Sequence, residues 1–244
     1  MANPILNEKA FNYGLSNSDT DSMTISGAIN KALMLSLILI LSAMTSVYFV
    51  IARNPSLFMP ATIVSSLGAM VLAIVMNFKK ELARGLSIFY AILEGVAIGC
   101  ISFIFNSVYD GIVIQAAFLT FLDLLVMLLL YKFRIIKVND TFKSIIFGAT
   151  ACIGVVYLVN MIMGFFGKSI PFLHDSSPLS IGISIVIVCV ASFNLLLDFN
   201  FMEECESRNM PKYFEWYTAF GLLVTLVWLY LEILKLLSKL RSRD

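Results

Sequence analysis

Long runs of apolar residues alternate with short polar segments along most of the chain. Most runs reach or approach the roughly 20 residues that a helix needs to cross the hydrocarbon core of a bilayer. The strands of a membrane barrel would alternate polar and apolar residues, which these runs do not, so each run is predicted to be a helix. The predicted spans are 29–52, 61–78, 86–108, 112–131, 144–166, 179–200 and 215–237.

The segments outside these runs are short. Residues 1–28 are polar and rich in Asn, Ser, Asp and Thr, and we interpret them as a mobile N-terminal tail. No connection between the spans is long enough to hold a soluble domain. The predicted fold is therefore all-α, a polytopic membrane bundle of seven helices over residues 29–240.

Composition agrees with lipid as the main solvent of this chain. Hydrophobic residues make up 59% of it and charged residues 14%, and the mean hydropathy is +0.90. A soluble domain typically carries about 25% charged residues. The formal charge of +1 is spread over short loops, so we expect the bilayer as a partner and no binding to nucleic acid.

The basic residues also predict an orientation, because short cytoplasmic loops carry an excess of Lys and Arg. With the N-terminus inside, the inner segments hold Lys79, Lys80 and the basic stretch 132–143. The sequence therefore favours a cytoplasmic N-terminus. The side of the basic C-terminal tail stays open.

Four acidic residues interrupt the apolar spans, where a charge costs at least about 2.5 kcal/mol on insertion scales. Such residues usually face a bundle interior or a polar path and mark candidate functional sites. They are Glu94, Asp123, Asp198 and Glu232.

Two of these acids have plausible structural roles. Glu94 lies in a stripe of small residues, Ala91, Gly95 and Gly99, that permits close approach of another helix. The stripe can be a packing seam only, and Glu94 can line a polar cavity. Asp123 has Thr120 one turn before it as a candidate hydrogen-bond partner, and it can be either a local polar group or part of an ion path.

Asp198 and Glu232 each interrupt a strongly apolar helix near the C-terminus. Two carboxylates that share a dry interior cannot both stay ionised cheaply, so such a pair would act as a proton switch. Their ionised oxygens would also suit Ca²⁺, which makes them candidate metal ligands. The alternative is that Asp198 ends its helix near the headgroups and that Glu232 pairs with Lys235 or Lys239.

Conventional catalysis finds little support in the sequence. The single histidine, His174, has no second His or Cys at ligand spacing, so a zinc site is not expected. There is no GxSxG elbow and no glycine-rich phosphate loop. We expect neither an enzyme nor a cofactor.

Three C-terminal stretches and two upstream ones resemble the Bax-inhibitor family of membrane proteins, in its bacterial branch. They are 194–199 (NLLLDF), 211–217 (PKYFEWY), 229–234 (LYLEIL), Asn3-Pro4 at the start, and Glu94-Gly95-x3-Gly99-x2-Ser102. The resemblance implies six helices around a central C-terminal helix, in a bacterial inner membrane. It also implies a pH-sensitive Ca²⁺ leak channel controlled by one acid in each of helices six and seven.

Carried over to this chain, those two acids fall on Asp198 and Glu232. Better-characterised members have Asp at the second position and a shorter interval between the two acids. A basic residue near the end of helix two, which can engage the acids in the family, would be Lys79 or Lys80 here.

Two functions follow as hypotheses. The first is a Ca²⁺ leak channel gated by protonation of an intramembrane acidic pair. The second is a non-conducting interaction protein that modulates a membrane-bound protease or a stress response. The channel needs a continuous polar path with Ca²⁺ and protons as ligands, whereas the modulator needs a membrane-protein partner.

Overall fold

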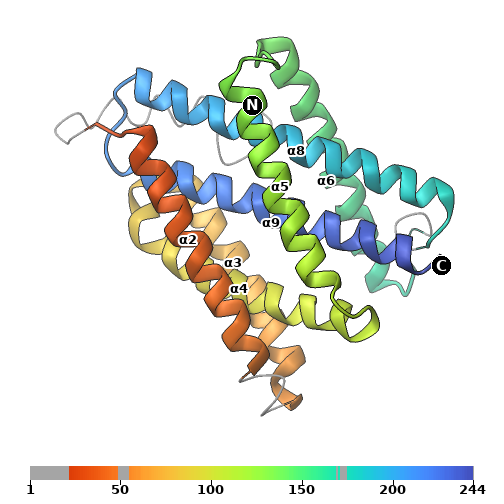
Figure 1. The fold of residues 1–244 in the computed structure, drawn as a ribbon. Coiled ribbons are helices and arrows are strands. Elements are labelled where there is room, and N and C mark those ends of the chain that lie inside the picture. Colours follow the sequence, from red (N-terminus) through yellow and green to blue (C-terminus); the bar gives the residue numbers. More distant parts are fainter. Residues whose placement is uncertain (1–21, 49–54, 169, 171–174, 244) are drawn as a thin grey trace. The chain divides into compact units, whose positions relative to one another are not determined.

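The computed structural model describes residues 22–48, 55–168, 170 and 175–243, and most of these belong to helices (Figure 1). Within the described residues, seven helices are long and apolar enough to cross a membrane. This confirms the helical membrane bundle and the seven spans predicted from the sequence; the central position of the last helix stays a prediction. The long helices are α2 (Ile25–Ser46), α3 (Phe58–Phe78), α4 (Ala83–Val108), α5 (Ile112–Lys132), α6 (Asp140–Phe165), α8 (Pro178–Ser207) and α9 (Phe214–Arg241), with short 3-10 helices η2 (Pro55–Leu57) and η3 (Lys80–Leu82) before α3 and α4.

The helix ends show where hydropathy and structure differ. The α8 helix continues beyond position 200, the predicted end of its span, through Glu203 and Glu204 to Ser207. The α9 helix likewise runs past position 237 to Arg241. Polar turns are stable as helix where they project out of the hydrocarbon, so an apolar run marks the lipid-facing band and not the whole helix.

Local sequence explains several helix starts. Asn139 precedes α6, and its Oδ1 accepts a hydrogen bond of 2.8 Å from the Phe142 amide, a standard N-cap. Gly111 precedes α5 with φ +74°, a left-handed conformation that glycine adopts without steric cost. Pro178 is the first residue of α8, where its missing N–H is not needed.

The described chain divides into two compact units, and each is considered by itself. The α2–α4 unit comprises the described residues up to Val108 together with 201–223. The α5–α6 unit comprises the described residues of 109–200 together with 224–243. The end of α8 and the start of α9 thus belong to the α2–α4 unit, and the remainder of both helices belongs to the α5–α6 unit.

In the α2–α4 unit, α4 packs against both α2 and α3. The approach to α2 is closest at the small residues of α4. A Cβ atom added to Gly95 would lie 2.7 Å from Ser42 Cβ, and one added to Gly99 would lie 2.5 Å from the Ala43 carbonyl oxygen. The predicted packing seam therefore exists, and the Ser42 hydroxyl reinforces it by donating to the Ile92 carbonyl at 2.6 Å.

The first described residues are packed against the connection between α8 and α9. Met23 is buried, and its amide donates to the Met210 carbonyl at 2.8 Å. The Ile25 amide donates to Glu206 Oε1 at 2.9 Å. The described part of the expected tail, 22–28, is therefore structured, because its backbone amides donate to acceptors far along the chain. The rest of that tail, 1–21, lies outside the described residues.

Candidate functional site

Glu232 is buried on α9, with 2% of its surface exposed, and both of its carboxylate oxygens have partners in the α5–α6 unit. The Tyr157 hydroxyl of α6 donates to Oε2 at 2.8 Å, and the Lys235 ammonium lies 3.0 Å from Oε1. The same ammonium stands 4.7 Å from the centroid of the Tyr157 ring, a cation–π distance. These three residues, the Glu232 triad, compensate a buried charge and realise the Lys235 pairing that the sequence left open.

Lys239 lies two turns beyond Glu232 on α9 and is also buried, at 8% exposed. Its Nζ donates to Ser180 Oγ and to Ser184 Oγ, each at 2.8 Å. The two serines are one turn apart on α8, so they form a matched pair of acceptors. These bonds place the end of α9 beside the start of α8 and fix the two helices as antiparallel.

Asp198 is fully buried on α8, at 0% exposed, and lies nine positions before the end of that helix. It therefore does not end the helix, as the alternative interpretation proposed. It is about five turns from Ser180, on the face of α8 that contacts α9.

The Lys239 bonds also show how far apart Glu232 and Asp198 lie along the helix axes, because they align position 239 of α9 with positions 180 to 184 of α8. At a rise of about 1.5 Å per residue, Glu232 is level with about position 189 of α8 and roughly 13 Å from the level of Asp198. Coupling between Asp198 and Glu232 would thus need intervening groups. Thr225 of α9 is buried. By the same rise per residue, its position along the helix axis differs from that of Asp198 by about 3 Å. Thr225 was not among the predicted site residues, because one hydroxyl in an apolar run carries no signal in the sequence.

Asp123 is partly buried on α5 and faces α8. The Ser192 hydroxyl of α8, which donates to the Val188 carbonyl of its own helix at 3.0 Å, lies near its carboxylate. The Asp123 Oδ2 atom is buried with no hydrogen-bond partner among the described residues. Thr120, the partner suggested by the sequence, donates instead to the Ala116 carbonyl of its own helix at 2.8 Å. Because position 192 of α8 is between the levels of Glu232 and Asp198, Asp123 lies between these two acids along the bundle.

The remaining predicted site residues belong to the α2–α4 unit. Glu94 is partly buried on α4, one turn after Tyr90. Lys79 is exposed at the end of α3. Lys80 is buried, and its ammonium lies 5.7 Å from the centroid of the Tyr217 ring. Of the two lysines, Lys80 is the one turned into the protein; its role as a basic lock stays a prediction.

Within the described residues, no three His, Cys, Asp or Glu side chains gather as a metal site. His174 lies outside the described residues. A Ca²⁺ ion usually has six to eight oxygen ligands. A dedicated carboxylate cage of three or more acids is therefore not formed by the described acids, and Asp198 or Glu232 would each have to contribute to Ca²⁺ binding with other oxygens.

A second buried carboxylate with several partners was not predicted from the sequence. It belongs to Glu215, in the first turn of α9. Glu215 is 0% exposed; its Oε1 accepts from the Thr24 amide at 3.0 Å and from the Thr24 hydroxyl at 3.1 Å. Lys31 forms an ion pair with Oε2, and the exposed Lys212 lies 3.3 Å from Oε1. No local pattern reveals this cluster, because its members come from opposite ends of the chain.

Seven apolar helices with carboxylates buried inside them define an integral membrane protein of the polytopic helical class. A family model described as Bax inhibitor 1 like matches residues 3–242. The match covers nearly the whole chain, so the protein belongs to this family, as the sequence resemblance indicated. A comparison with curated proteins gives no match.

Proposed function

We propose that the protein is a pH-sensitive Ca²⁺ leak channel whose opening depends on protonation of acids inside its membrane-spanning helices. One observation carries the proposal: Glu232, Asp123 and Asp198 lie at three successive levels along α8 in the α5–α6 unit. Ionisable groups are expensive inside a membrane and typically mark ion or proton paths. Carboxylates spaced along the helix axis would let a cation pass from one acid to the next.

The spacing of the acids supports conduction over tight binding. Carboxylate oxygens suit a hard cation such as Ca²⁺. An ion that conducts must bind well enough to enter and weakly enough to leave. Separate acids meet this condition better than a cage of three or more carboxylates would, and no such cage exists in the described residues.

The Glu232 triad supplies a local response to pH. Ionised Glu232 holds the Lys235 ammonium and accepts from the Tyr157 hydroxyl. Protonation removes the negative charge that attracts Lys235, so the triad rearranges between α6 and α9. Ca²⁺ competes with protons for the ionised acids, because both draw on the same oxygens. In this proposal Glu94 lines the path in the α2–α4 unit and Lys80 acts as its basic lock.

The proposal also includes a location. A bacterial inner membrane, with the N-terminus in the cytoplasm, would expose the channel to a Ca²⁺ gradient and to changes of pH. The excess of basic residues in the inner segments supports this orientation.

The test is Ca²⁺ flux into liposomes that contain the purified protein, recorded with an enclosed dye over a pH series. We expect wild-type flux to change with pH, and Asp198→Asn and Glu232→Gln each to flatten that profile, since an amide does not titrate. Asp140→Asn is the matched control, because Asp140 is exposed at the start of α6 in the same unit.

Two outcomes would contradict the proposal. The proton-switch mechanism fails if both buried-acid variants keep the wild-type pH profile. Channel function itself fails if wild-type liposomes show no protein-dependent flux at any pH. The second result would favour the non-conducting modulator of a membrane-bound protease.

A further inference from the structure

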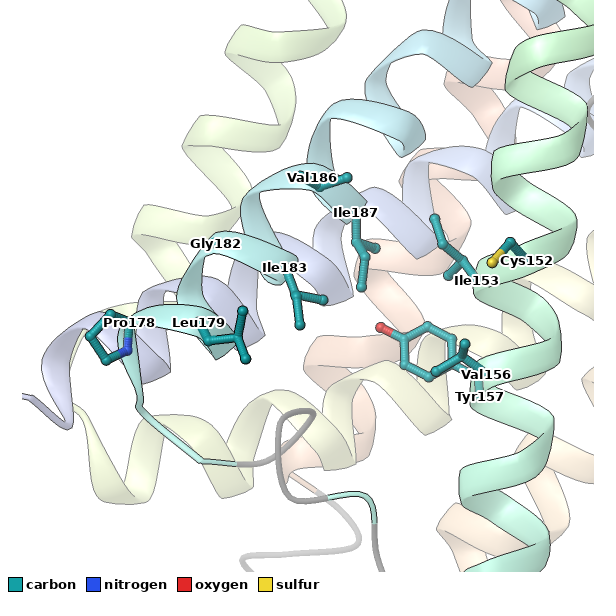
Figure 2. A pocket seen from close by; sticks show the side chains of 10 residues that line it. All are labelled: Cys152, Ile153, Val156, Tyr157, Pro178, Leu179, Gly182, Ile183, Val186 and Ile187. Atoms are coloured by element: carbon teal, nitrogen blue, oxygen red, sulfur yellow. The ribbon is translucent and has the colours of Figure 1, made fainter.

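An apolar pocket of about 580 Å³ lies between α6 and α8 in the α5–α6 unit. The wall from α6 runs from Cys152 to Tyr157, and the wall from α8 runs from Pro178 to Ile187 (Figure 2). With about 30 Å³ for a group the size of a water molecule, this volume takes roughly 20 such groups in a row or cluster. The pocket therefore has room for one long hydrocarbon chain.

The pocket lies where lipid is the solvent. Its lining is almost wholly aliphatic, and the neighbouring faces of α6 and α8 expose large apolar side chains, among them Val155, Leu158, Leu179 and Val186. Because both helices are candidate membrane spans, hydrocarbon must cover these faces. Acyl chains are thus the ligand class present at the pocket.

The end of the unit where α8 begins carries an excess of positive charge. Arg241 donates to the Asp110 carbonyl at 2.7 Å and to Gln115 at 3.0 Å, so the start of α5 lies at this end with the end of α9. The described basic residues of these segments outnumber the acidic ones. The basic residues are Lys168, Lys235, Lys239, Arg241 and Arg243, and the acidic ones are Asp110, Asp175 and Glu232.

One of these cations lies directly beside the pocket. Lys235 stands 4.7 Å from the ring of Tyr157, which is part of the pocket wall, and 41% of its side chain is exposed. Basic groups between membrane helices are typical binding partners of anionic lipid headgroups. An apolar pocket that runs inward from a basic end matches an amphiphile with one anionic end.

We propose that this pocket holds one acyl chain of an anionic phospholipid, with the headgroup at the basic end formed by Lys235 and the cations around it. The bound chain packs against the Tyr157 ring, on the side of α6 that carries the Glu232 triad. The lipid is thus a partner of the protein whether or not the protein conducts Ca²⁺.

Two cysteines give a direct test without any mutation. Cys152 and Cys189 are both free and exposed; Cys152 lines the pocket, and Cys189 is on α8 outside the lining. The purified protein in detergent is treated with a membrane-permeant maleimide, with phosphatidylglycerol or phosphatidylcholine added. We expect phosphatidylglycerol to slow modification of Cys152 several-fold and to leave Cys189 unchanged, and phosphatidylcholine to have a much smaller effect.

A second arm fills the pocket. A Cβ added to Gly182, in the α8 wall, meets no atom within 4 Å, so Gly182→Phe fits locally and occupies the space of the acyl chain. Gly148 on α6 is equally open and lies outside the lining, so Gly148→Phe is the matched control. Native mass spectrometry should show phosphatidylglycerol retained by wild type and Gly148→Phe and reduced about tenfold in Gly182→Phe.

Each negative result overturns a defined part of the proposal. Equal modification rates of Cys152 with and without either lipid would exclude an acyl chain in the pocket. Equal protection by both lipids would exclude the anionic headgroup. If Gly182→Phe does not fold, the thiol measurement on the wild-type protein still decides.

Discussion

The Thr24 amide nitrogen and Glu215 Oε1 lie 3.0 Å apart, although 191 positions separate the two residues along the chain. This contact fastens the start of α2 to the start of α9. The same carboxylate is paired with Lys31. We expect Glu215→Ala to lower the stability of the protein by about 1 to 3 kcal/mol, because it leaves the partly buried Lys31 without its counter-ion and the Thr24 amide without its acceptor. Thermal unfolding in detergent measures this loss.

Lys212 is the control for that prediction. It contacts the same carboxylate at 3.3 Å, but 52% of its side chain is exposed. Exposed ion pairs contribute at most about 1 kcal/mol. A loss of stability in Lys212→Ala as large as in Glu215→Ala would show that the less exposed pair with Lys31 is not the important contact.

The α2–α4 seam predicts opposite effects for two glycines of one helix. At Gly99 an added Cβ would meet the Ala43 carbonyl oxygen at 2.5 Å, whereas at Gly85 it would meet nothing within 4 Å. Gly99→Ala should therefore lower stability by about 1 to 3 kcal/mol through overpacking. Gly85→Ala should be neutral or raise stability by up to about 1 kcal/mol, since alanine is the better helix former. Thermal unfolding that ranks the two variants the other way would contradict the described seam.

The Glu232 triad predicts a shift in the pH response of Ca²⁺ flux. Tyr157→Phe removes the hydroxyl that donates to Glu232 Oε2 at 2.8 Å and keeps the ring under Lys235. The carboxylate loses the hydroxyl that donates to it, so the triad should respond differently to protons and the midpoint of the flux profile should shift. Tyr48→Phe, on a tyrosine of the α2–α4 unit, is the control. An unchanged midpoint in Tyr157→Phe would remove Glu232 from the pH response.

The buried Lys239 predicts a rescue. Ser180→Ala with Ser184→Ala removes both described acceptors of its ammonium, and an unsatisfied buried donor costs about 1 to 3 kcal/mol, more for a charged one. Adding Lys239→Met to this double variant removes the ammonium and should restore most of the stability. If the triple variant is no more stable than the double variant in thermal unfolding, the two serines stabilise the helices by packing and not through Lys239.

Hydropathy predicts the number of helices because each membrane-spanning helix satisfies its backbone hydrogen bonds within itself and needs its own apolar run. Each run can therefore be recognised without knowing how the helices pack. The span predicted at 112–131 agrees with α5, Ile112–Lys132, to one residue at its end. Helix ends are predicted less well where the helix has polar turns. The α8 helix continues to Ser207 through glutamates that hydropathy assigns to a loop.

The site is only partly visible in the sequence. The ion pair of Glu232 with Lys235 could be proposed because the residues are three apart on a helix. The bond from Tyr157 to Glu232 spans 75 positions and depends on how α6 meets α9, which no local pattern encodes. The level of Asp198 was equally hidden, because the register of α8 against α9 is set by Lys239 and two serines without any distinctive motif.

The seam between α2 and α4 has a consequence for handling the protein outside its membrane. At Gly95 and Gly99 the contact is made by backbone and small side chains in direct touch. Such a contact depends on dispersion and on the Ser42 hydrogen bond, and not on expelling water from apolar surface. Exchange of lipid for detergent changes the surrounding solvent but leaves these forces in place. The pairing of α2 with α4 should therefore survive solubilisation and delipidation conditions that empty the pocket between α6 and α8.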